Sequence, residues 1–228
     1  GVLGGLRVTM LKDEIGIFHA CLAQAFLALL VFIAIATTDF WASLPKIDVD
    51  LAPLKKLAIA TALAIYLQLA LGATMRHQHR DLAILDFPTA NGGWIPDTGP
   101  SAITKINTWR DAHALSDVGA FQIWLQMTHR FLALLIAISV VTFCLRVWRS
   151  GIVPLRRLSI LWTALLLIQV TLGAWTIWSN KAADIATAHV AVGAMMLSFG
   201  VSISAILSRI LRTNARSISP LPITGAIA

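Results

Sequence analysis

Five long apolar segments limit the folds that this sequence can adopt. A helix needs about 20 apolar residues to cross the hydrocarbon core of a membrane, and each segment approaches or exceeds that length. Hydrophobic residues make up 57% of the chain and charged residues only 13%, against about 45–50% and about 25% in soluble domains. We therefore predict an all-α integral membrane protein with five transmembrane helices. The segments, to within a few residues, are 15–37, 57–75, 121–147, 158–178 and 185–211.

The basic residues lie at the ends of the apolar segments rather than on one broad surface. The net charge is +7, and an excess of Arg and Lys marks the cytoplasmic ends of membrane helices. We therefore place the connection around residue 150 and the C-terminus in the cytoplasm of a bacterial-type plasma membrane, and residues 76–120 outside. The pattern does not indicate a nucleic-acid partner. The arginines that carry this argument are Arg146, Arg149, Arg156, Arg157, Arg209, Arg212 and Arg216.

Three histidines, His19, His129 and His189, lie inside the apolar segments. Ionisable groups at this depth are costly and usually functional. The predicted orientation puts all three toward the outer side, with His129 and His189 at similar depths on antiparallel helices. Neutral imidazole is a common axial ligand of haem iron, so the pattern predicts a haem held between His129 and His189. The alternative for each histidine is a packed, hydrogen-bonded residue without a ligand.

Two arginines near these histidines indicate how a haem would be oriented. Arg130 follows His129 directly, and Arg76 follows the second apolar segment. Because guanidinium groups match the geometry of carboxylates, we expect both arginines to meet the haem propionates. Small residues near the histidines leave room for a flat macrocycle, namely Ala133, Ala188, Gly193 and Ala194.

The remaining histidines and the two cysteines give weaker indications. His77 and His79 are two residues apart at a helix end, and we expect them to be solvated at the interface rather than to bind metal. His113 has no partner pattern. Cys21 and Cys144 fall near opposite ends of their segments, so we predict two small buried side chains and no disulfide.

A short motif recurs along the chain and indicates an internal repeat. Two stretches, LQLALGA (67–73) and IQVTLGA (168–174), match more fully and have Gln68 and Gln169 in register, and a third copy near the N-terminus is weaker. Repeated membrane units often place a site at their interface, although small residues also simply allow close helix packing. The copies are VLGGLRV (2–8), LALGATM (69–75) and VTLGAWT (170–176).

A histidine follows two of these copies at nearly the same distance. His19 lies 15 residues after Gly4, and His189 lies 16 residues after Gly173. Close packing of small residues alone does not account for this regularity. The repeat therefore favours a functional role for these histidines.

Four kinds of motif occur in a definite order over nearly the whole chain. In this order and spacing, the sequence resembles the haem A synthase family. The motifs are the HR pair at 129–130, the LGA triplets at 71–73 and 172–174, RHQHRDLAILDFPTANGGWIPD at 76–97, and AHVAVGAMML at 188–197.

The resemblance implies a cofactor, a substrate and a reaction. Members of the family have eight membrane helices in two similar four-helix halves, and they convert haem O to haem A by oxidising a ring methyl to a formyl group. The second half holds haem b (heme B) between two histidines, which His129 and His189 match. The first half holds the substrate haem, and His19 matches the later of its two histidines. The four helices after residue 51 would then form a haem-binding bundle.

The resemblance also implies how the chain divides. Residues 1–50 would be the end of the first half with its last helix, 51–216 the second half, and 217–228 a cytoplasmic tail. The ExxHR signature of the first half is absent, and Gln126 occupies the position of its glutamate. We therefore expect an electron-carrying half, with the essential acid and the partner of His19 upstream of residue 1.

The sequence thus predicts a haem A synthase-like oxidoreductase for cytochrome oxidase cofactor biosynthesis, incomplete for catalysis by itself. Expected partners are haem O, membrane lipid, and either haem O synthase or a second copy of the chain; the electron donor is not indicated. One alternative is a b-type membrane cytochrome that only transfers electrons, and another is a non-haem transporter or assembly factor. No phosphate-binding loop, nucleophile elbow or HExxH motif is present, which argues against the corresponding enzymes.

Overall fold

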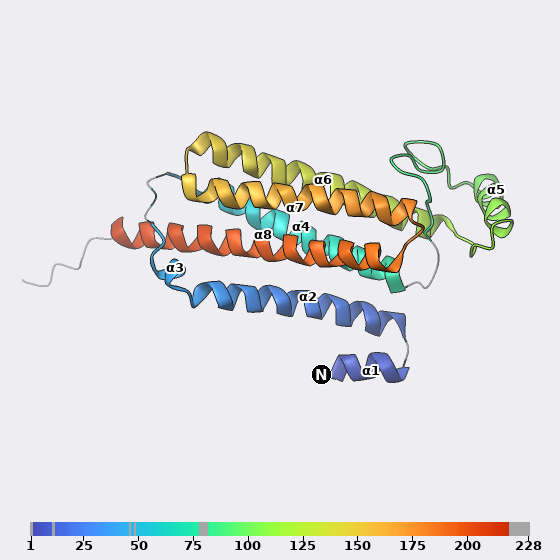
Figure 1. Cartoon of the computed structure of the whole chain (residues 1–228), viewed down its shortest axis with the longest axis horizontal. Helices are drawn as coiled ribbons and strands as arrows, with labels where there is room; N and C mark the ends of the chain where they lie inside the picture. Colours follow the sequence, from blue (N-terminus) through green and yellow to red (C-terminus); the bar gives the residue numbers. More distant parts are fainter. Residues whose placement is uncertain (1, 11, 46, 48, 78–81, 219–228) are drawn as a thin grey trace, which may run out of the picture.

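The chain folds into long, nearly parallel and antiparallel helices (Figure 1). The computed structural model describes residues 2–218 except 11, 46, 48 and 78–81. Among these residues the only β-type pairing is an isolated bridge between Ala90 and Gly93, so the all-α prediction is confirmed. The helices are α1 (Val2–Met10), α2 (Asp13–Ala36), α3 (Asp39–Ala42), α4 (Ala52–His77), α5 (Pro100–Asp111), α6 (Ala120–Ser150), α7 (Val153–Trp178) and α8 (Ala183–Ile218).

Five of the described helices, α2, α4, α6, α7 and α8, are long and apolar enough to cross a membrane. The shortest of these spans has 24 residues, which is about 36 Å at 1.5 Å per residue and exceeds a hydrocarbon core of about 30 Å. Large apolar side chains on the outer surfaces remain exposed, among them Phe18, Leu22 and Phe26 of α2. A surface of this kind suits lipid rather than water. The protein is an integral membrane protein, as predicted.

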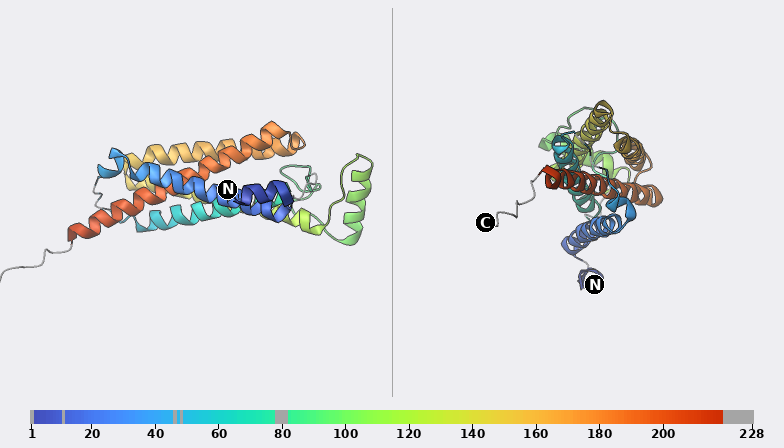
Figure 2. Two further views of the ribbon diagram at one scale, coloured as in Figure 1. Left: turned by 90° about the horizontal axis from the view of Figure 1, so that it is seen from below. Right: turned by 90° about the vertical axis from the view of Figure 1, so that its left-hand side faces the viewer.

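Helices α4, α6, α7 and α8 form a four-helix bundle, and α2 lies along the side made by α4 and α8 (Figures 1 and 2). Short turns connect α6 to α7 and α7 to α8, which makes these neighbours antiparallel. The turn between α6 and α7 contains Gly151, whose φ of 73° lies in the left-handed region that glycine adopts without strain. The short helix α1 packs against α2.

The bundle core is filled at the end near the α6–α7 turn. Trp162 and Phe143 are fully buried there with their rings edge to face at 5.6 Å, and the Trp162 indole donates to the carbonyl of Met196 at 3.2 Å. Gly200 allows this packing, because an added Cβ would lie 3.1 Å from the Cβ of Ala62 and 3.2 Å from the Trp162 ring. The opposite end of the bundle is hollow, as described below.

The connection between α4 and α6 packs with the first turns of α6 around a small core, which comprises Ala83, Ile84, Ala90, Val118, Ile123 and Met127. Arg110, at the end of α5, is 1% exposed and donates to the carbonyls of Ser116 at 2.7 Å and Leu82 at 2.9 Å. Asn107 exchanges two hydrogen bonds of 3.0 Å with the backbone of Val118. These bonds satisfy backbone groups that a buried loop would otherwise leave unpaired. The described part of this connection covers the hollow end of the bundle, and we call it the cap.

Candidate functional site

A cavity of about 900 Å³ occupies the hollow end of the bundle, between α2, α4, α6, α7 and α8. Its size is at the upper end of the range of about 300–1,000 Å³ that is typical of small-molecule and cofactor sites. Apolar residues form most of its wall, and no Asp or Glu occurs among the described residues that line it. The basic residues in the wall are His19, His77, His129, His189, Arg76, Arg130 and Lys181.

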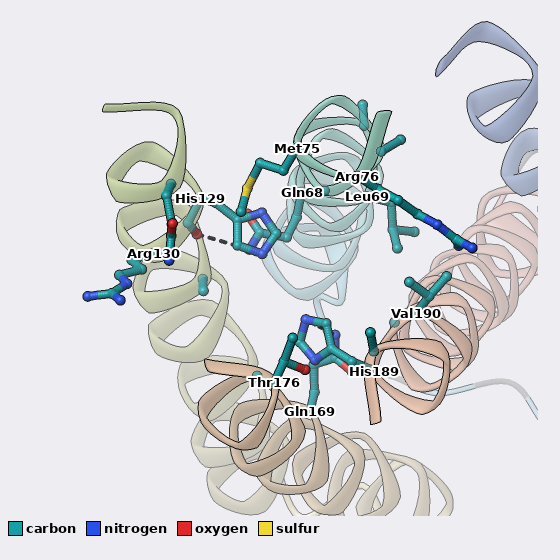
Figure 3. A pocket seen from close by; sticks show the side chains of 18 of the residues that line it. Gln68, Leu69, Met75, Arg76, His129, Arg130, Gln169, Thr176, His189 and Val190 are labelled. Carbon is teal, nitrogen blue, oxygen red and sulfur yellow. Dashed lines mark hydrogen bonds between the residues drawn. The ribbon is translucent and has the colours of Figure 1, made fainter. Parts of the chain in front are cut away.

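His129 of α6 and His189 of α8 face each other across this cavity (Figure 3). Both residues are half-buried. Since α6 and α8 lie on different sides of the bundle and α4 and α7 complete the wall, a flat ligand between the rings would be enclosed by protein. The structure thus brings together the two histidines that the sequence predicted as a ligand pair.

Each membrane histidine lies over the glycine of a copy of the recurring motif. A Cβ added at Gly72 would lie 3.5 Å from Cε1 of His129, and one added at Gly173 would lie 3.1 Å from Cε1 of His189. The same relation joins Gly4 to His19, at 3.5 Å. The missing side chain lets the imidazole approach the neighbouring helix closely, and this explains why the repeat pairs a glycine with a histidine.

Several polar atoms that face this site lack a partner. Nδ1 of His129 and Nδ1 of His189 are buried without a hydrogen bond, as are the Oε1 atoms of Gln24, Gln68 and Gln169. Leaving a polar group buried and unpaired costs free energy. The arrangement therefore fits a cavity in which a ligand or ordered water completes the interactions of the side chains.

His19 lines the same cavity from α2, on the side away from the bundle's α6–α7 wall. His77, at the end of α4, is 8% exposed and packs on Gly16, where an added Cβ would lie 2.5 Å from its Cε1. The expectation of a solvated His77 is therefore wrong, because α2 covers the end of α4. His79 lies outside the described residues.

Arg130 is directed to the cap instead of into the space between the histidines (Figure 3). Its guanidinium donates to the carbonyls of Thr89 at 2.8 Å and Asp86 at 2.7 Å, and it lies 5.6 Å from the centre of the Phe87 ring. Arg76 is exposed at the edge of the cavity, and its side chain extends away from His129 in Figure 3. A role for either arginine at haem propionates stays a prediction.

Gln126 joins the cap to α6 three residues before His129. Its amide donates to the carbonyl of Ile84 at 2.9 Å, and its Oε1 accepts from the amide of Ile84 at 3.0 Å. The side chain is 4% exposed. Gln126 is thus a structural contact between α6 and the cap, and no pattern in the sequence indicated that role.

Asp86 organises the turn of the cap that Arg130 contacts. Its carboxylate accepts hydrogen bonds from the Thr89 hydroxyl at 2.7 Å and from the amides of Asn91 at 2.7 Å and Gly92 at 3.0 Å. Burial acts to raise the pKa of Asp86, but the bonds from Gly92, Thr89 and Asn91 outweigh it, so the pKa lies below its ordinary value. The carboxylate therefore stays ionised at neutral pH.

The other candidate residues have structural surroundings. His113 is exposed, stacks on the Trp109 ring at 3.9 Å and places Nδ1 2.7 Å from the Trp109 carbonyl, in agreement with its lack of a functional pattern. Cys21 and Cys144 are free and half-buried rather than fully buried as expected. Within the described residues, no group of three or more His, Cys, Asp or Glu side chains is placed to hold a metal ion.

Comparison with known proteins points to one family. The model of the COX15-CtaA family, described as cytochrome oxidase assembly protein, matches residues 1–201. A protein named heme A synthase from Rhizorhabdus wittichii is 27% identical over 201 residues, which are 86% of this chain and 53% of that protein. A heme A synthase from Caulobacter vibrioides is 26% identical over 196 residues, which are 84% of this chain and 52% of that protein. The chain spans about half the length of these curated relatives.

Proposed function

The chain belongs to the COX15-CtaA family of cytochrome oxidase assembly proteins, and from this premise we propose that it acts in haem A biosynthesis as a haem A synthase-like oxidoreductase. The observation that carries the proposal is the pair His129 and His189, which face each other across a cavity between the membrane-spanning helices. The names of the two relatives support the pathway. Conversion of haem O to haem A is the reaction that we assign to the whole protein.

The residues present fit a haem b between His129 and His189. Both imidazoles present unpaired buried nitrogens, and neutral imidazole is the ligand that low-spin haem iron takes in many membrane cytochromes. Such a group, once bound, would supply one-electron transfer. The protein's part is to fix the two rings over Gly72 and Gly173 and to exclude water with the cap.

His19 is proposed to contact the substrate haem O from α2. His19 lines the cavity from α2, which packs against α4 and α8. Its ring lies over Gly4, as the rings of His129 and His189 lie over Gly72 and Gly173. The cavity wall contains no carboxylate among the described residues. We therefore propose that an acid for the oxidation lies elsewhere in the whole protein, as the resemblance to the family implies.

A second candidate function is electron transfer alone, by a b-type membrane cytochrome. The specific observation in its favour is Gln126, a neutral residue fully engaged with Ile84 at the position where the resemblance would place an acid. Among the described residues, this side of the cavity has histidines that can hold a cofactor but no carboxylate to accept a proton from a substrate.

Replacement of each histidine by alanine tests the proposal. We expect the purified protein to show the spectrum of a six-coordinate b-type haem, and His129→Ala and His189→Ala each to abolish it. His113→Ala is the matched control, since His113 is exposed in the cap, and it should keep the spectrum. An unchanged six-coordinate spectrum in either membrane variant would refute ligation by that histidine.

The identity of the extracted haem separates the two candidate functions. A haem A synthase isolated from its native membrane should yield haem B together with some haem O or haem A. A plain cytochrome should yield haem B alone. Chromatography of acid-extracted haem distinguishes these outcomes.

A further inference from the structure

Two consecutive residues of the cap, Phe87 and Pro88, belong to the cavity wall. Phe87 is half-buried, and its ring lies between residues of two helices. The guanidinium carbon of Arg130 of α6 is 5.6 Å from the centre of this ring, and the ring of Trp178, the last residue of α7, meets it edge to face at 6.2 Å. The Phe87 ring therefore bridges α6 and the end of α7 at the cavity.

Arg130 holds the backbone on both sides of this dipeptide. Its Nη2 donates to the carbonyl of Asp86 at 2.7 Å, and its Nη1 donates to the carbonyl of Thr89 at 2.8 Å. These are the residues directly before Phe87 and directly after Pro88. Because a guanidinium presents its donors in a fixed planar fork, the two bonds together set the position of the segment that lines the cavity.

The Asp86 carboxylate closes the same turn from its other side. It accepts hydrogen bonds from the Thr89 hydroxyl and from the amides of Asn91 and Gly92. The backbone on either side of Phe87 is thus bonded both to α6 and within the cap. The phenyl ring has no polar group of its own, so its place at the cavity follows from the place of this backbone.

We propose that Phe87 restricts the passage of water and hydrophilic solutes into the cavity, and that Arg130 is the positioning residue that keeps Phe87 in place. The apolar surroundings of a haem control the access of solvent to it and thereby influence its reduction potential. The consequence for a haem between His129 and His189 rests on the proposed function, whereas restricted access is a property of the chain itself.

The competing role for Arg130 is the contact with a haem propionate that the sequence predicts. In the structure its guanidinium points to the cap and away from the space between the histidines (Figure 3). The two roles differ in the haem-free protein. Loss of a cation from the cavity wall should slow the entry of an anionic reagent by electrostatics, whereas loss of the bonds that hold Phe87 should accelerate it.

The experiment measures the rate at which an anionic methanethiosulfonate reagent labels a cysteine in the haem-free chain, purified in detergent. Cys21 and Cys144 are replaced by serine. Thr176→Cys supplies the reporter, since Thr176 is half-buried and lines the cavity from α7. In a parallel series Val140→Cys reports unfolding, because Val140 is 1% exposed in the packed end of the bundle.

The inference predicts the sign and the order of the changes at the reporter. Arg130→Met should raise the labelling rate of Thr176→Cys about tenfold, a factor that the loss of one hydrogen bond to a charged group accounts for. Phe87→Ala, which removes the ring, should raise the rate at least as much. The double variant should label no faster than Phe87→Ala, because both substitutions act on the same ring.

The chain offers a matched control for each substitution. Trp94→Ala removes an aromatic ring from the same connection, but Trp94 is 74% exposed and does not line the cavity. Arg76→Met removes a cation from the cavity wall, and the structure shows no hydrogen bond from Arg76 to the described part of the cap. Neither control should raise the labelling rate of Thr176→Cys.

An unchanged or lower rate in Arg130→Met, with Val140→Cys still protected, would overturn the inference and favour the propionate contact. If Val140→Cys becomes labelled, the variant has unfolded and Trp178→Ala decides the question. Trp178 is 65% exposed, so its removal costs little packing, and it should also raise the rate; no increase would overturn the inference. Absence of a two-histidine haem spectrum from the unmodified protein would instead overturn the proposed function and leave the labelling result intact.

Discussion

The glycines under the histidine rings differ in how closely they are approached. An added Cβ would lie 3.1 Å from Cε1 of His189 at Gly173, but 3.5 Å from Cε1 of His129 at Gly72. The first distance requires the ring to move, whereas the second is an ordinary van der Waals contact. The two sites, which look equivalent in the sequence repeat, should therefore tolerate substitution differently.

Gly173→Ala should reduce the amount of bound haem b more than Gly72→Ala does. Alanine favours a helix by about 1 kcal/mol over glycine, so a loss would come from displacement of the His189 ring and not from the helix. The measurement is the ratio of haem to protein after purification. Gly5→Ala is the control, since an added Cβ there meets nothing within 4 Å. Equal haem content in the Gly72 and Gly173 variants would contradict the steric argument.

Asp86 gives the cap a pH dependence with a defined sign. Its lowered pKa means that the ionised form stabilises the folded turn, fully above the ordinary value of about 3.9 and progressively less as pH falls through the lowered folded value. Asp86→Asn should reproduce the acid state at neutral pH. We expect faster hydrogen exchange at Asn91 and Gly92, whose amides bond the carboxylate, and unchanged exchange within α8. Unaltered exchange at both amides would refute this role.

At the scale of elements, the cap and α6 are joined by residues on both sides of His129. Gln126 bonds both backbone groups of Ile84, and Arg130 bonds the carbonyls of Asp86 and Thr89. A rotation of α6 that moved His129 would also disrupt these four bonds. The position of the cap and the position of the ring are thus determined together.

Gln126→Glu should loosen the cap. The ionised carboxylate keeps an acceptor but cannot donate to the Ile84 carbonyl, and a buried unpaired group of this kind costs about 1–3 kcal/mol. We expect a lower midpoint of thermal unfolding in detergent and faster proteolysis within residues 82–119. Gln122→Glu is the matched control. The Oε1 of Gln122 accepts a hydrogen bond from the Gly119 amide at 3.0 Å, and a glutamate at this position can still accept that bond. Identical behaviour of the two variants would show that the donor of Gln126 is unimportant.

Sequence patterns predicted the membrane-spanning helices better than the helix in the connection between α4 and α6. All five spans were predicted, although α4 and α7 begin five residues early, since Lys55, Lys56, Arg156 and Arg157 extend them beyond the apolar segments. Helix α5 was missed because it is short and polar, and its buried Arg110 has no periodic signal.

The histidine pair could be predicted because an imidazole in an apolar run is unusual. The burial of His77 could not, since it depends on the packing of α2 against the end of α4.

At the scale of the whole molecule, the arginine distribution predicts which face of the protein meets the cytoplasm. Lys105 in α5 and Arg157 at the start of α7 are both exposed and lie at opposite ends of the bundle. In a variant that lacks Cys21 and Cys144, we expect a membrane-impermeant thiol reagent to label Lys105→Cys in intact cells. Arg157→Cys should react only after the membrane is disrupted. The reverse pattern would place the histidines toward the cytoplasm.

The bundle is packed with side chains at one end and hollow at the other, so its stability is divided unevenly. Side-chain packing stabilises the end around Trp162 and Phe143. The stability of the end that contains the cavity would depend on the bound haem. Binding to the folded state adds stability by mass action, about 4 kcal/mol when the free ligand is at 1,000 times its dissociation constant. The supply of haem would then govern the lifetime of the protein in the cell, because we expect the haem-free form to open first at its hollow end and to be cleaved there by proteases.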